Sequence, residues 1–173
     1  MSTVDDDPVL GAIFARRVVR NMTSEPVDPA HLATILRAAR AAPNAGNRRL
    51  QPVVPVTDPE RLRLLRMVAP GMVARPTAAA VICIDQPRAI EYGFDPASPG
   101  LFIDVGTTAA TMLLAAEALH LAAEPVTSFS RVAASRLLDL ADRIEPRLIV
   151  CLGHRGDSQP PAMGRWAEEI ATP

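Results

Sequence analysis

A long apolar segment between residues 101 and 123 constrains the fold more than any other part of the chain. It reads LFIDVGTTAATMLLAAEALHLAA, which has the length of a helix and is apolar on almost every side. Small residues, in the run from Thr107 to Ala110 and again at Ala115, allow neighbouring helices to approach closely. A helix without a polar face must be buried, so we expect it to be covered by the rest of its own chain or by a second copy of the chain.

The size and composition of the chain indicate one domain over residues 1–173, with residues 1–7 as a solvated arm. The sequence is 49% hydrophobic but only 3% aromatic, so the core must be built from Leu, Val, Ile, Met and Ala. All 18 basic residues are arginine and are spread along a chain of net charge -1, which argues against nucleic acid as a partner. The N-terminus lacks the charge and apolar run of a signal peptide. We therefore expect a cytoplasmic protein without membrane association.

Periodicity predicts further helices and strands on both sides of the apolar segment. Apolar residues at helical spacing predict three helices: residues 7–19, 28–42 and from 58 onward. Asp28 and Asp58 fit N-cap positions because each is followed by proline. Three strands are predicted: residues 53–57, 77–85 and 145–153. The second and third strands are continuous apolar runs, which is typical of strands covered on both faces.

The two cysteines, Cys83 and Cys151, each lie in an apolar run and show no CxxC spacing. We expect both thiols to be buried, reduced and dispensable for activity. The three histidines have no partners at metal-ligand spacing, so no metal site is expected.

The stretch RRVVRN, residues 16–21, places three guanidinium groups within five residues. Taken alone, it fits the C-terminus of a helix, where the helix dipole favours each cation by about 0.3 to 1 kcal/mol. The alternative is an anion site, because guanidinium groups form paired, charge-assisted hydrogen bonds with phosphate oxygens. The segments that follow in the chain favour this second interpretation.

Taken in order, these segments resemble the nitroreductase family of flavoproteins. RRVVRNMTSEPVD is similar to the family's R-R-S-x-R pattern with its following P-V, and APNAGNRRLQ is similar to A-P-S-x-x-N-x-Q-P-W. Further similarities are RPTAAAVICID, DVGTTAATMLLAAEALHL, EPVTSF, EPRLIVCLG and RWAEEI. Each motif is weak, but their order and spacing from about Phe14 to Ile170 are specific.

The resemblance implies an α+β fold, a nitroreductase-like sandwich with a central mixed sheet flanked by helices. It also implies a dimer whose core is the apolar helix from Asp104 to Leu121.

The resemblance further implies an FMN site assembled from both chains of a homodimer. The arginine segment would hold the phosphate and ribityl chain, and a later arginine would close the phosphate site. The loop after the second predicted helix would lie against the flavin of the partner subunit, and the EPVTSF turn would approach flavin N5. The residues carried over are Arg16, Arg17, the backbone of Val18, Arg20, Pro43, Asn44, Asn47, Thr127, Ser128 and Arg165, with Arg155 as a substitute for Arg165.

The chemistry would belong to FMN, so no catalytic side chain is expected. The sequence has no GxSxG motif and no carboxylate dyad. Two acids on the apolar helix stand out, and we interpret Asp104 as its N-cap and Glu117 as a carboxylate satisfied at an interface.

Three functions remain open. The first is an FMN-dependent oxidoreductase that transfers hydride from NAD(P)H to nitro-aromatic, quinone or enone acceptors. The second is a flavin oxidase of a peptide-derived metabolite, because APGMVARPTAAAVICID and PVTSF also resemble the nitroreductase-like subunit of cyclodipeptide oxidases. The third is a non-catalytic binding or partner subunit that has lost FMN. It arises because Val18 stands where the family has serine, and Arg49 to Gln51 stand where it has Q-P-W.

Overall fold

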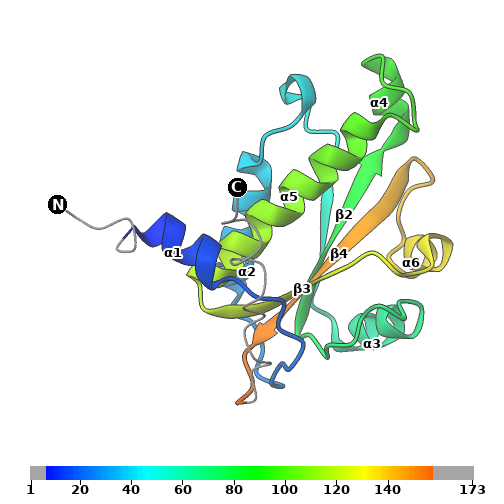
Figure 1. Ribbon diagram of the computed structural model, residues 1–173. Coiled ribbons are helices and arrows are strands. Elements are labelled where there is room, and N and C mark those ends of the chain that lie inside the picture. Colours follow the sequence, from blue (N-terminus) through cyan, green and yellow to red (C-terminus); the bar gives the residue numbers. More distant parts are fainter. Residues whose placement is uncertain (1–6, 158–173) are drawn as a thin grey trace, which may run out of the picture.

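The computed structural model describes residues 7–157 of the 173-residue chain. The elements in chain order are α1 (Pro8–Ala15), α2 (Pro29–Ala41), the short 3₁₀ helix η2 (Ala45–Asn47), β1 (Val53–Val56), α3 (Pro59–Met67), β2 (Ala78–Asp85), α4 (Gln86–Glu91), α5 (Pro99–Ala118), β3 (Leu121–Val126), α6 (Arg131–Leu137) and β4 (Ile144–His154). A central sheet separates two helical layers, α2 with α5 on one face and α3 with α6 on the other (Figure 1). The expected α+β class is confirmed.

The sheet has the strand order β1-β2-β4-β3. All three strand pairs run antiparallel, so the mixed sheet that we expected is not found among the described residues. The reason lies in the connections. The end of β1 pairs with the start of β2 (Val56 opposite Ala79), so the chain leaves and re-enters the sheet at the same end through α3. The connection from β3 to β4 through α6 likewise leaves and re-enters the sheet at one end. Strands joined in this way run antiparallel.

Strand β2 is buried along its whole length, as its continuous apolar run predicts. Its side chains alternate between two cores. Ala80 and Ile82 lie in the core beneath α2 and α5, whereas Val81 and Cys83 lie in the core beneath α3 and α6. The sheet is therefore covered on both faces within a single chain.

The N-caps of α2 and α3 are confirmed. The Asp28 carboxylate accepts a hydrogen bond from the Ala30 backbone N–H (2.7 Å), and the Asp58 carboxylate accepts one from that of Arg61 (2.8 Å). Helix α1 is shorter than predicted, because the chain becomes extended after Ala15. The cause is a tertiary contact on the sheet, described with the candidate site below.

Helix α5 is the apolar segment, and it ends earlier than predicted. His120 adopts a left-handed backbone conformation (φ 57°) after Ala118, and residues 121–126 form β3 instead of more helix. The prediction overran because a buried strand and a buried helix are equally apolar. Helices α4 and α6 were not predicted at all.

Eight residues of α5 are buried, so the sheet and α2 cover much of the helix. By length and composition alone α5 could cross a membrane, but its contacts are those of a core helix in a folded domain. Part of the helix remains uncovered, because Phe102 and Ile103 are 42% and 63% exposed.

Both cysteines are buried with free thiols, as predicted. Burial raises the pKa of the Cys83 thiol to about 12. Burial, and to a smaller extent the charge of Glu124, also raises the pKa of the Cys151 thiol. Neither thiol carries the low pKa that marks a reactive cysteine.

We expect the free energy of unfolding to fall as the pH rises above 9. In the unfolded chain a cysteine ionises at the ordinary pKa of 9.0, whereas the folded chain keeps the Cys83 thiol protonated up to about pH 12. The unfolded state is therefore favoured by about 1.4 kcal/mol per pH unit for this thiol within that window. Urea unfolding between pH 8 and 10.5 measures the slope. The Cys83→Ala variant should show a smaller slope, and equal slopes would show that burial of this thiol has no such effect.

Candidate functional site

The arginine segment, residues 16–20, is an extended stretch attached to the edge of the sheet. Val19 is only 2% exposed, and its backbone N–H donates to the carbonyl oxygen of Ala123 in β3 (3.1 Å). Side chains alternate in an extended chain, so burial of Val19 turns Val18 and Arg20 outward. This contact explains why α1 stops before the arginine segment.

The three arginines of the segment have different environments. Arg17 Nη1 donates to the carbonyl oxygens of Phe14 (2.7 Å) and Arg16 (2.8 Å), so Arg17 caps the end of α1. Arg20 Nε donates to Glu124 Oε1 at 2.5 Å. The half-buried Arg16 side chain has no hydrogen-bond or ion-pair partner among the described residues. The helix-end interpretation holds for Arg17, whereas Arg16 and the outer nitrogens of Arg20 can still bind an anion.

The backbone of this segment offers further donors. The N–H groups of Arg17 and Val18 donate no hydrogen bond to any group in the described part of the chain. Two consecutive N–H groups beside guanidinium groups form a donor set suited to phosphate oxygens. The residues present therefore fit the phosphate of FMN.

Glu124 is a residue of this site that the sequence analysis missed. It lies in β3 and is 1% exposed. Its Oε1 accepts from Arg20 and its Oε2 accepts from the Ala74 backbone N–H (3.1 Å), so the buried carboxylate is satisfied from two sides. Glu124 thereby holds the Arg20 guanidinium at the edge of the sheet. The sequence signal was the first residue of the EPVTSF motif, a single acid directly after an apolar run.

Thr127 and Ser128, the predicted contact for flavin N5, follow β3 directly. The carbonyl oxygen of Ser128 accepts from the Gly71 backbone N–H (3.0 Å), and a Cβ on Gly71 would come within 3.0 Å of the Ser128 Cβ. The backbone N–H of Thr127 donates no hydrogen bond within the described residues. Thr127 lies four positions after Ala123, which is about 13 Å at the rise of a strand. One strand thus carries both the anchor of the arginine segment and the predicted turn.

The polar loop after α2 is held in place by α5. The Asp104 carboxylate, which is 6% exposed, accepts from the Ala45 backbone N–H (3.0 Å) and from Gln51 Nε2 (3.3 Å). Thr107 Oγ1 donates to the carbonyl oxygen of Pro43 (2.9 Å). The loop is therefore fixed to a buried helix at several points instead of being free in solvent.

Asp104 is not the N-cap of α5, so that interpretation is wrong. The helix begins one turn earlier, with Ser98 as N-cap and Pro99 as its first residue. Glu117 is satisfied within its own chain by Arg155 Nη2 at 2.5 Å, and its place at an interface stays a prediction. Both acids have structural partners that account for their burial.

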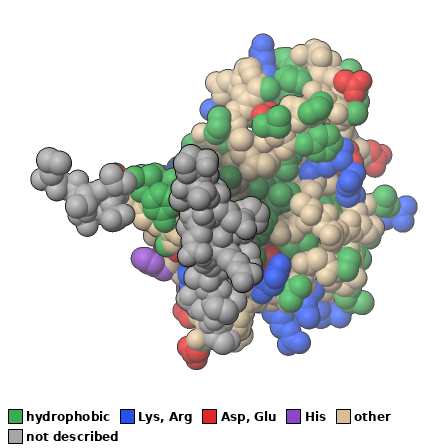
Figure 2. Space-filling model, viewed as in Figure 1, with side chains coloured by type: hydrophobic (Ala, Val, Ile, Leu, Met, Phe, Trp, Pro, Cys, Tyr) green, Lys and Arg blue, Asp and Glu red, His purple; other side chains and the backbone are tan. Residues whose placement is uncertain are grey.

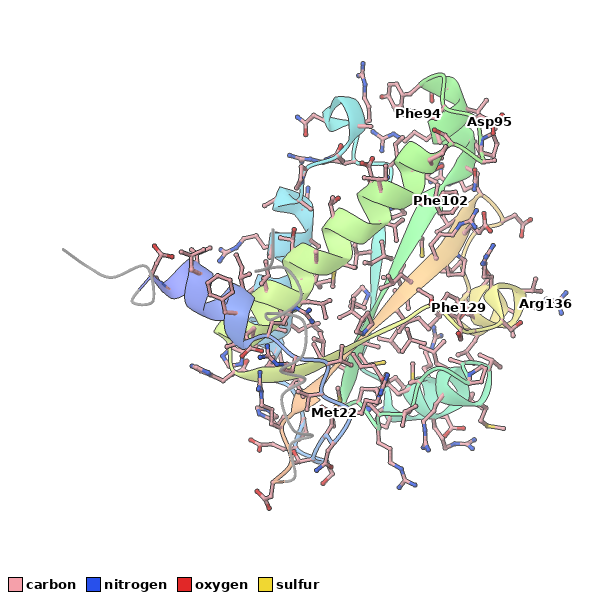
Figure 3. The ribbon with its side chains drawn as sticks, viewed as in Figure 1. Met22, Phe94, Asp95, Phe102, Phe129 and Arg136 are labelled. Carbon is pink, nitrogen blue, oxygen red and sulfur yellow. The ribbon has the colours of Figure 1, made fainter. Side chains whose placement is uncertain are left out.

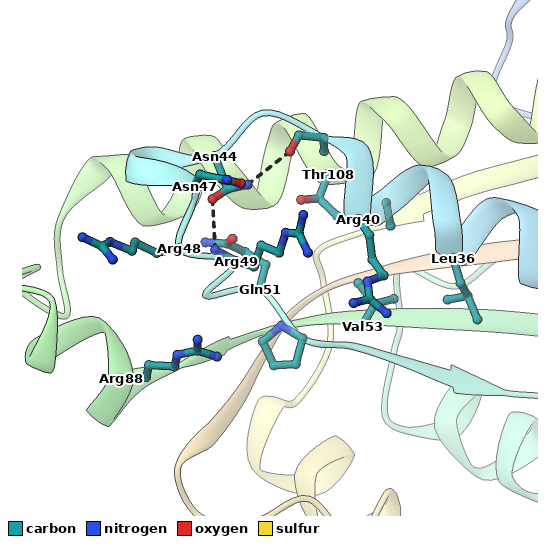
Figure 4. A pocket seen from close by; sticks show the side chains of 13 residues that line it. Leu36, Arg40, Asn44, Asn47, Arg48, Arg49, Gln51, Val53, Arg88 and Thr108 are labelled. Carbon is teal, nitrogen blue, oxygen red and sulfur yellow. Dashed lines mark hydrogen bonds between the residues drawn. The ribbon is translucent and has the colours of Figure 1, made fainter.

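Two asparagines of the loop were predicted to face the partner's flavin. Asn44 Oδ1 accepts from the Arg49 backbone N–H (3.0 Å), so Asn44 shapes the loop (Figure 4). The Asn47 side chain has no hydrogen-bond partner among the described residues and is available for a ligand. Gly46, Asn47 and Arg49 all have left-handed backbones, with φ of 59°, 54° and 52°. Such a conformation is uncommon for arginine and indicates a loop held in a defined shape.

The loop forms one wall of a cleft of about 800 Å³. Both asparagines line it (Figure 4), together with four arginines from three elements: Arg40, Arg48, Arg49 and Arg88. No residue of the arginine segment or of the EPVTSF turn lines this cleft. This cleft therefore contains only one of the two groups of predicted site residues.

The two groups lie at opposite ends of α5 in a single chain (Figure 1). Asp104 and Thr107, near the start of α5, hold the loop, whereas Glu117, near its end, pairs with Arg155 next to Met22. The separation from Asp104 to Glu117 is about 20 Å at 1.5 Å per helical residue. One described chain thus does not bring the two groups of predicted site residues together, and a site formed by two chains stays a prediction.

Two arginines, Arg165 and Arg155, were predicted as alternatives for the late position of the phosphate site. Arg165 lies outside the described residues. Arg155, its proposed substitute, forms an antiparallel bridge with Met22, which is labelled in Figure 3, and commits its guanidinium to Glu117. Arg155 therefore serves as a structural ion pair between β4 and α5.

Residues 7–157 contain no group of three or more His, Cys, Asp or Glu side chains placed to hold a metal ion. The donors that do gather in the described site are guanidinium groups, amides and backbone N–H groups. These groups suit an anionic organic cofactor.

An antiparallel sheet between two helical layers, with a cationic segment at one edge and a polar loop over the central helix, defines an α+β sandwich protein. The chain belongs to the nitroreductase family, which matches residues 13–85 and 74–154. It is thus an oxidoreductase-family protein, as the motifs predicted.

Solved structures agree with this assignment. A protein from Parabacteroides distasonis, proposed to be an NADH dehydrogenase/NAD(P)H nitroreductase, is 24% identical over 96% of this chain and 98% of its own, with a TM-score of 0.80. Nitroreductase A from Vibrio parahaemolyticus is 27% identical over 96% of this chain and 75% of its own, with a TM-score of 0.79. A proposed NADH oxidase from Clostridium acetobutylicum is 22% identical over 93% and 97%, with a TM-score of 0.78.

Proposed function

We propose that the protein is an FMN-dependent oxidoreductase that takes electrons from NAD(P)H and delivers them to nitro-aromatic, quinone or enone acceptors. The family membership supports an oxidoreductase, and the names of the structural neighbours support NADH or NADPH as the electron donor. When bound, FMN supplies the redox chemistry, and the protein supplies position and polarity.

The observation that carries the proposal is the set of unpaired donors in the arginine segment. Arg16, the outer nitrogens of Arg20, and the N–H groups of Arg17 and Val18 lie within one five-residue segment beside β3 and have no acceptors among the described residues. Unpaired donors of this kind are stabilised when an anion accepts their hydrogen bonds. These groups would hold the FMN phosphate, while Glu124 keeps Arg20 in position.

The remaining residues would act on the ring system of FMN. The N–H of Thr127, at the other end of β3, would donate to its polar edge. Asn47, contributed by the partner subunit, would donate and accept through its amide. In each chain, Asp104 would hold that chain's own loop in place by accepting hydrogen bonds from Ala45 and Gln51.

We propose a homodimer because the two groups of site residues lie at opposite ends of α5. Apolar side chains on two helices are left exposed and could be covered by a second copy: Val9, Ile13 and Phe14 on α1, and Phe102 and Ile103 on α5. Figure 2 shows apolar side chains at the surface of this part of the molecule, around α1 and near the start of α5. A symmetric dimer would place the same surface of each chain against the other.

The visible absorption spectrum of the purified protein tests the proposed function. Bound oxidised flavin, together with flavin bleaching by NADH or NADPH under anaerobic conditions, is the expected result. A flavin that is not bleached by either nucleotide, but is reduced by a cyclic dipeptide, would favour the oxidase alternative. A colourless protein that does not take up added FMN would favour the non-catalytic alternative.

Replacing Ile103 by glutamate is expected to convert the dimer into a monomer and to abolish FMN binding. The side chain is 63% exposed in one chain, so the monomer tolerates the charge, but burying it between two chains would cost several kcal/mol. Sedimentation velocity at micromolar concentration measures the change. Val132→Glu, at a similarly exposed position on α6, is the control and should remain a dimer with FMN. A dimer in the Ile103 variant would contradict the proposed interface.

A further inference from the structure

The cleft beside the polar loop contains four arginines and no acidic residue among its described lining. Arg40 comes from the last turn of α2, Arg48 and Arg49 from the loop, and Arg88 from α4. Figure 4 shows these side chains around the cleft together with Asn44, Asn47 and Gln51. Four formal positive charges therefore surround one cavity of about 800 Å³.

The guanidinium groups of these arginines are not paired with acids. None of the four forms a hydrogen bond or an ion pair through its side chain with the residues that the structure describes. Elsewhere in the described chain some arginines do find acids, as in the pairs Arg61 with Asp139 and Arg63 with Glu60. In this cleft, four arginines without an acidic partner among the described residues line one cavity.

Two of the arginines are positioned by an aromatic ring. The Arg48 guanidinium lies 4.5 Å from the centre of the Tyr92 ring, and that of Arg88 lies 5.8 Å from it. Stacking on an aromatic face restrains a guanidinium without using its N–H groups. Both groups therefore keep their hydrogen-bond donors for a ligand.

The other side of the cleft is positioned by the backbone. Asn44 holds the Arg49 N–H, and the left-handed conformation of Arg49 fixes the direction in which its side chain leaves the loop. Asp104 ties the same loop to α5 through Ala45. The arginines thus project from supported elements, although like charges so close together repel one another.

We propose that this arginine cleft, formed by Arg40, Arg48, Arg49 and Arg88, binds an anionic group of the molecule that exchanges electrons with the flavin. The inference rests on the proposed function, because Asn47 of the same cleft is the residue expected at the partner's flavin. An anion would neutralise the mutual repulsion and accept hydrogen bonds from planar guanidinium groups, whose geometry matches carboxylate and phosphate oxygens. The cleft therefore selects acidic substrates over neutral ones of the same size.

The anionic group can come from two sources. It is either a carboxylate on the electron acceptor or a phosphate on the nicotinamide donor, and both present oxygens in a geometry that guanidinium groups bind. Two ligand pairs distinguish them. 4-Nitrobenzoate and 4-nitrobenzamide differ in charge at almost constant shape, and NADP⁺ and NAD⁺ differ by one phosphate.

The test uses the full-length protein with its flavin oxidised, and measures ligand affinity by isothermal titration calorimetry. The double variant Arg49→Gln/Arg88→Gln removes two charges from opposite walls of the cleft and keeps side chains of similar length. Its fold should survive, because neither guanidinium makes a hydrogen bond or ion pair among the described residues. Arg136→Gln is the matched control. Arg136 lies in α6, on the other face of the sheet (Figure 3).

For wild type and for the control we expect the more anionic member of at least one pair to bind about tenfold more tightly. The double variant should lose most of that preference. If the preference for 4-nitrobenzoate over 4-nitrobenzamide is lost, the anionic group belongs to the electron acceptor. If the preference for NADP⁺ over NAD⁺ is lost, it belongs to the nicotinamide donor. Higher salt should weaken the preference of the wild type.

Two results would overturn the inference: no preference in either pair for wild type, or an unchanged preference in the double variant. Neither depends on whether FMN binds normally. The FMN content, read from the visible spectrum of the same samples, tests the proposed function separately. If the protein takes up no FMN, the proposed function fails, and the affinity ratios then show on their own whether the cleft selects anions.

Discussion

Replacing Arg16 by alanine is expected to weaken FMN binding about ten- to a hundredfold and to leave the flavin-free protein as stable as the wild type. The reason is that the Arg16 side chain has no hydrogen-bond or ion-pair partner among the described residues, so its removal breaks no such contact there. A charge-assisted hydrogen bond to phosphate contributes about 1.5 to 3 kcal/mol, which corresponds to this loss of affinity. Quenching of FMN fluorescence on titration with protein measures it.

Arg20→Ala serves as an informative comparison. It should lower FMN affinity by a similar factor, but it should also destabilise the flavin-free protein, because it leaves one oxygen of the buried Glu124 without its donor. Adding Glu124→Gln to Arg20→Ala should recover part of the stability and none of the affinity. Riboflavin, which lacks the phosphate, should bind wild type and variants with similar weakness. Unchanged FMN affinity in both arginine variants would leave the segment without a role in phosphate binding.

Replacing Asp104 by alanine is expected to have the second large effect, a loss of about 3 kcal/mol in the free energy of unfolding together with weaker FMN binding. The variant leaves the Ala45 N–H and the Gln51 amide without their acceptor. Hydrogen bonds to a charged acceptor contribute about 1.5 to 3 kcal/mol each. The loop would no longer be held against α5, so Asn47 would not be held toward the partner's flavin. Urea unfolding and FMN titration measure the two effects.

Asp104→Asn is the matched control for this prediction. Its amide oxygen can still accept from the Ala45 N–H, and the Gln51 amide can rotate to accept from its NH₂ group. We therefore expect about one third of the stability loss of the alanine variant. If the asparagine and alanine variants were equally destabilised, the charge of Asp104 and not its hydrogen bonds would be what holds the loop.

The parts of the fold that could be predicted from the sequence are those with a local cause. Asp28 and Asp58 precede prolines and cap helices as predicted, since capping depends on neighbours in the chain. β2 was predicted from its continuous apolar run, because burial on both faces removes the alternation of polar residues. The family was predicted because weak motifs in a fixed order are jointly specific.

The parts that could not be predicted depend on contacts between distant segments. Helix α1 stops at Ala15 because Val19 pairs with Ala123, more than a hundred residues further along the chain. Glu124 was missed because its importance comes from Arg20 and not from its neighbours in the sequence. Sequence patterns recognise periodicity and local capping, but they do not show which buried acid meets which arginine.

The arginine cleft was missed for the same reason. Its members come from three separate segments: Arg40 is one of two arginines on α2, and Arg88 is the single arginine of α4. The sequence drew attention only to the RLQ segment, as a departure from the family pattern. The fold brings these residues to one cavity and leaves their charges unpaired within the described chain.

Each FMN site, as proposed, takes its arginines from one chain and its loop from the other. Complementation between two variants tests it most directly. One variant carries Arg16→Ala, and the second carries Asn44→Ala with Asn47→Gly, where glycine tolerates the left-handed backbone. Each alone should bind FMN weakly. Co-expressed with different tags and purified as mixed dimers, they should regain wild-type affinity at about half of their sites, because one site then receives both intact parts. Mixed dimers that bind no more FMN than either variant alone would contradict a shared site.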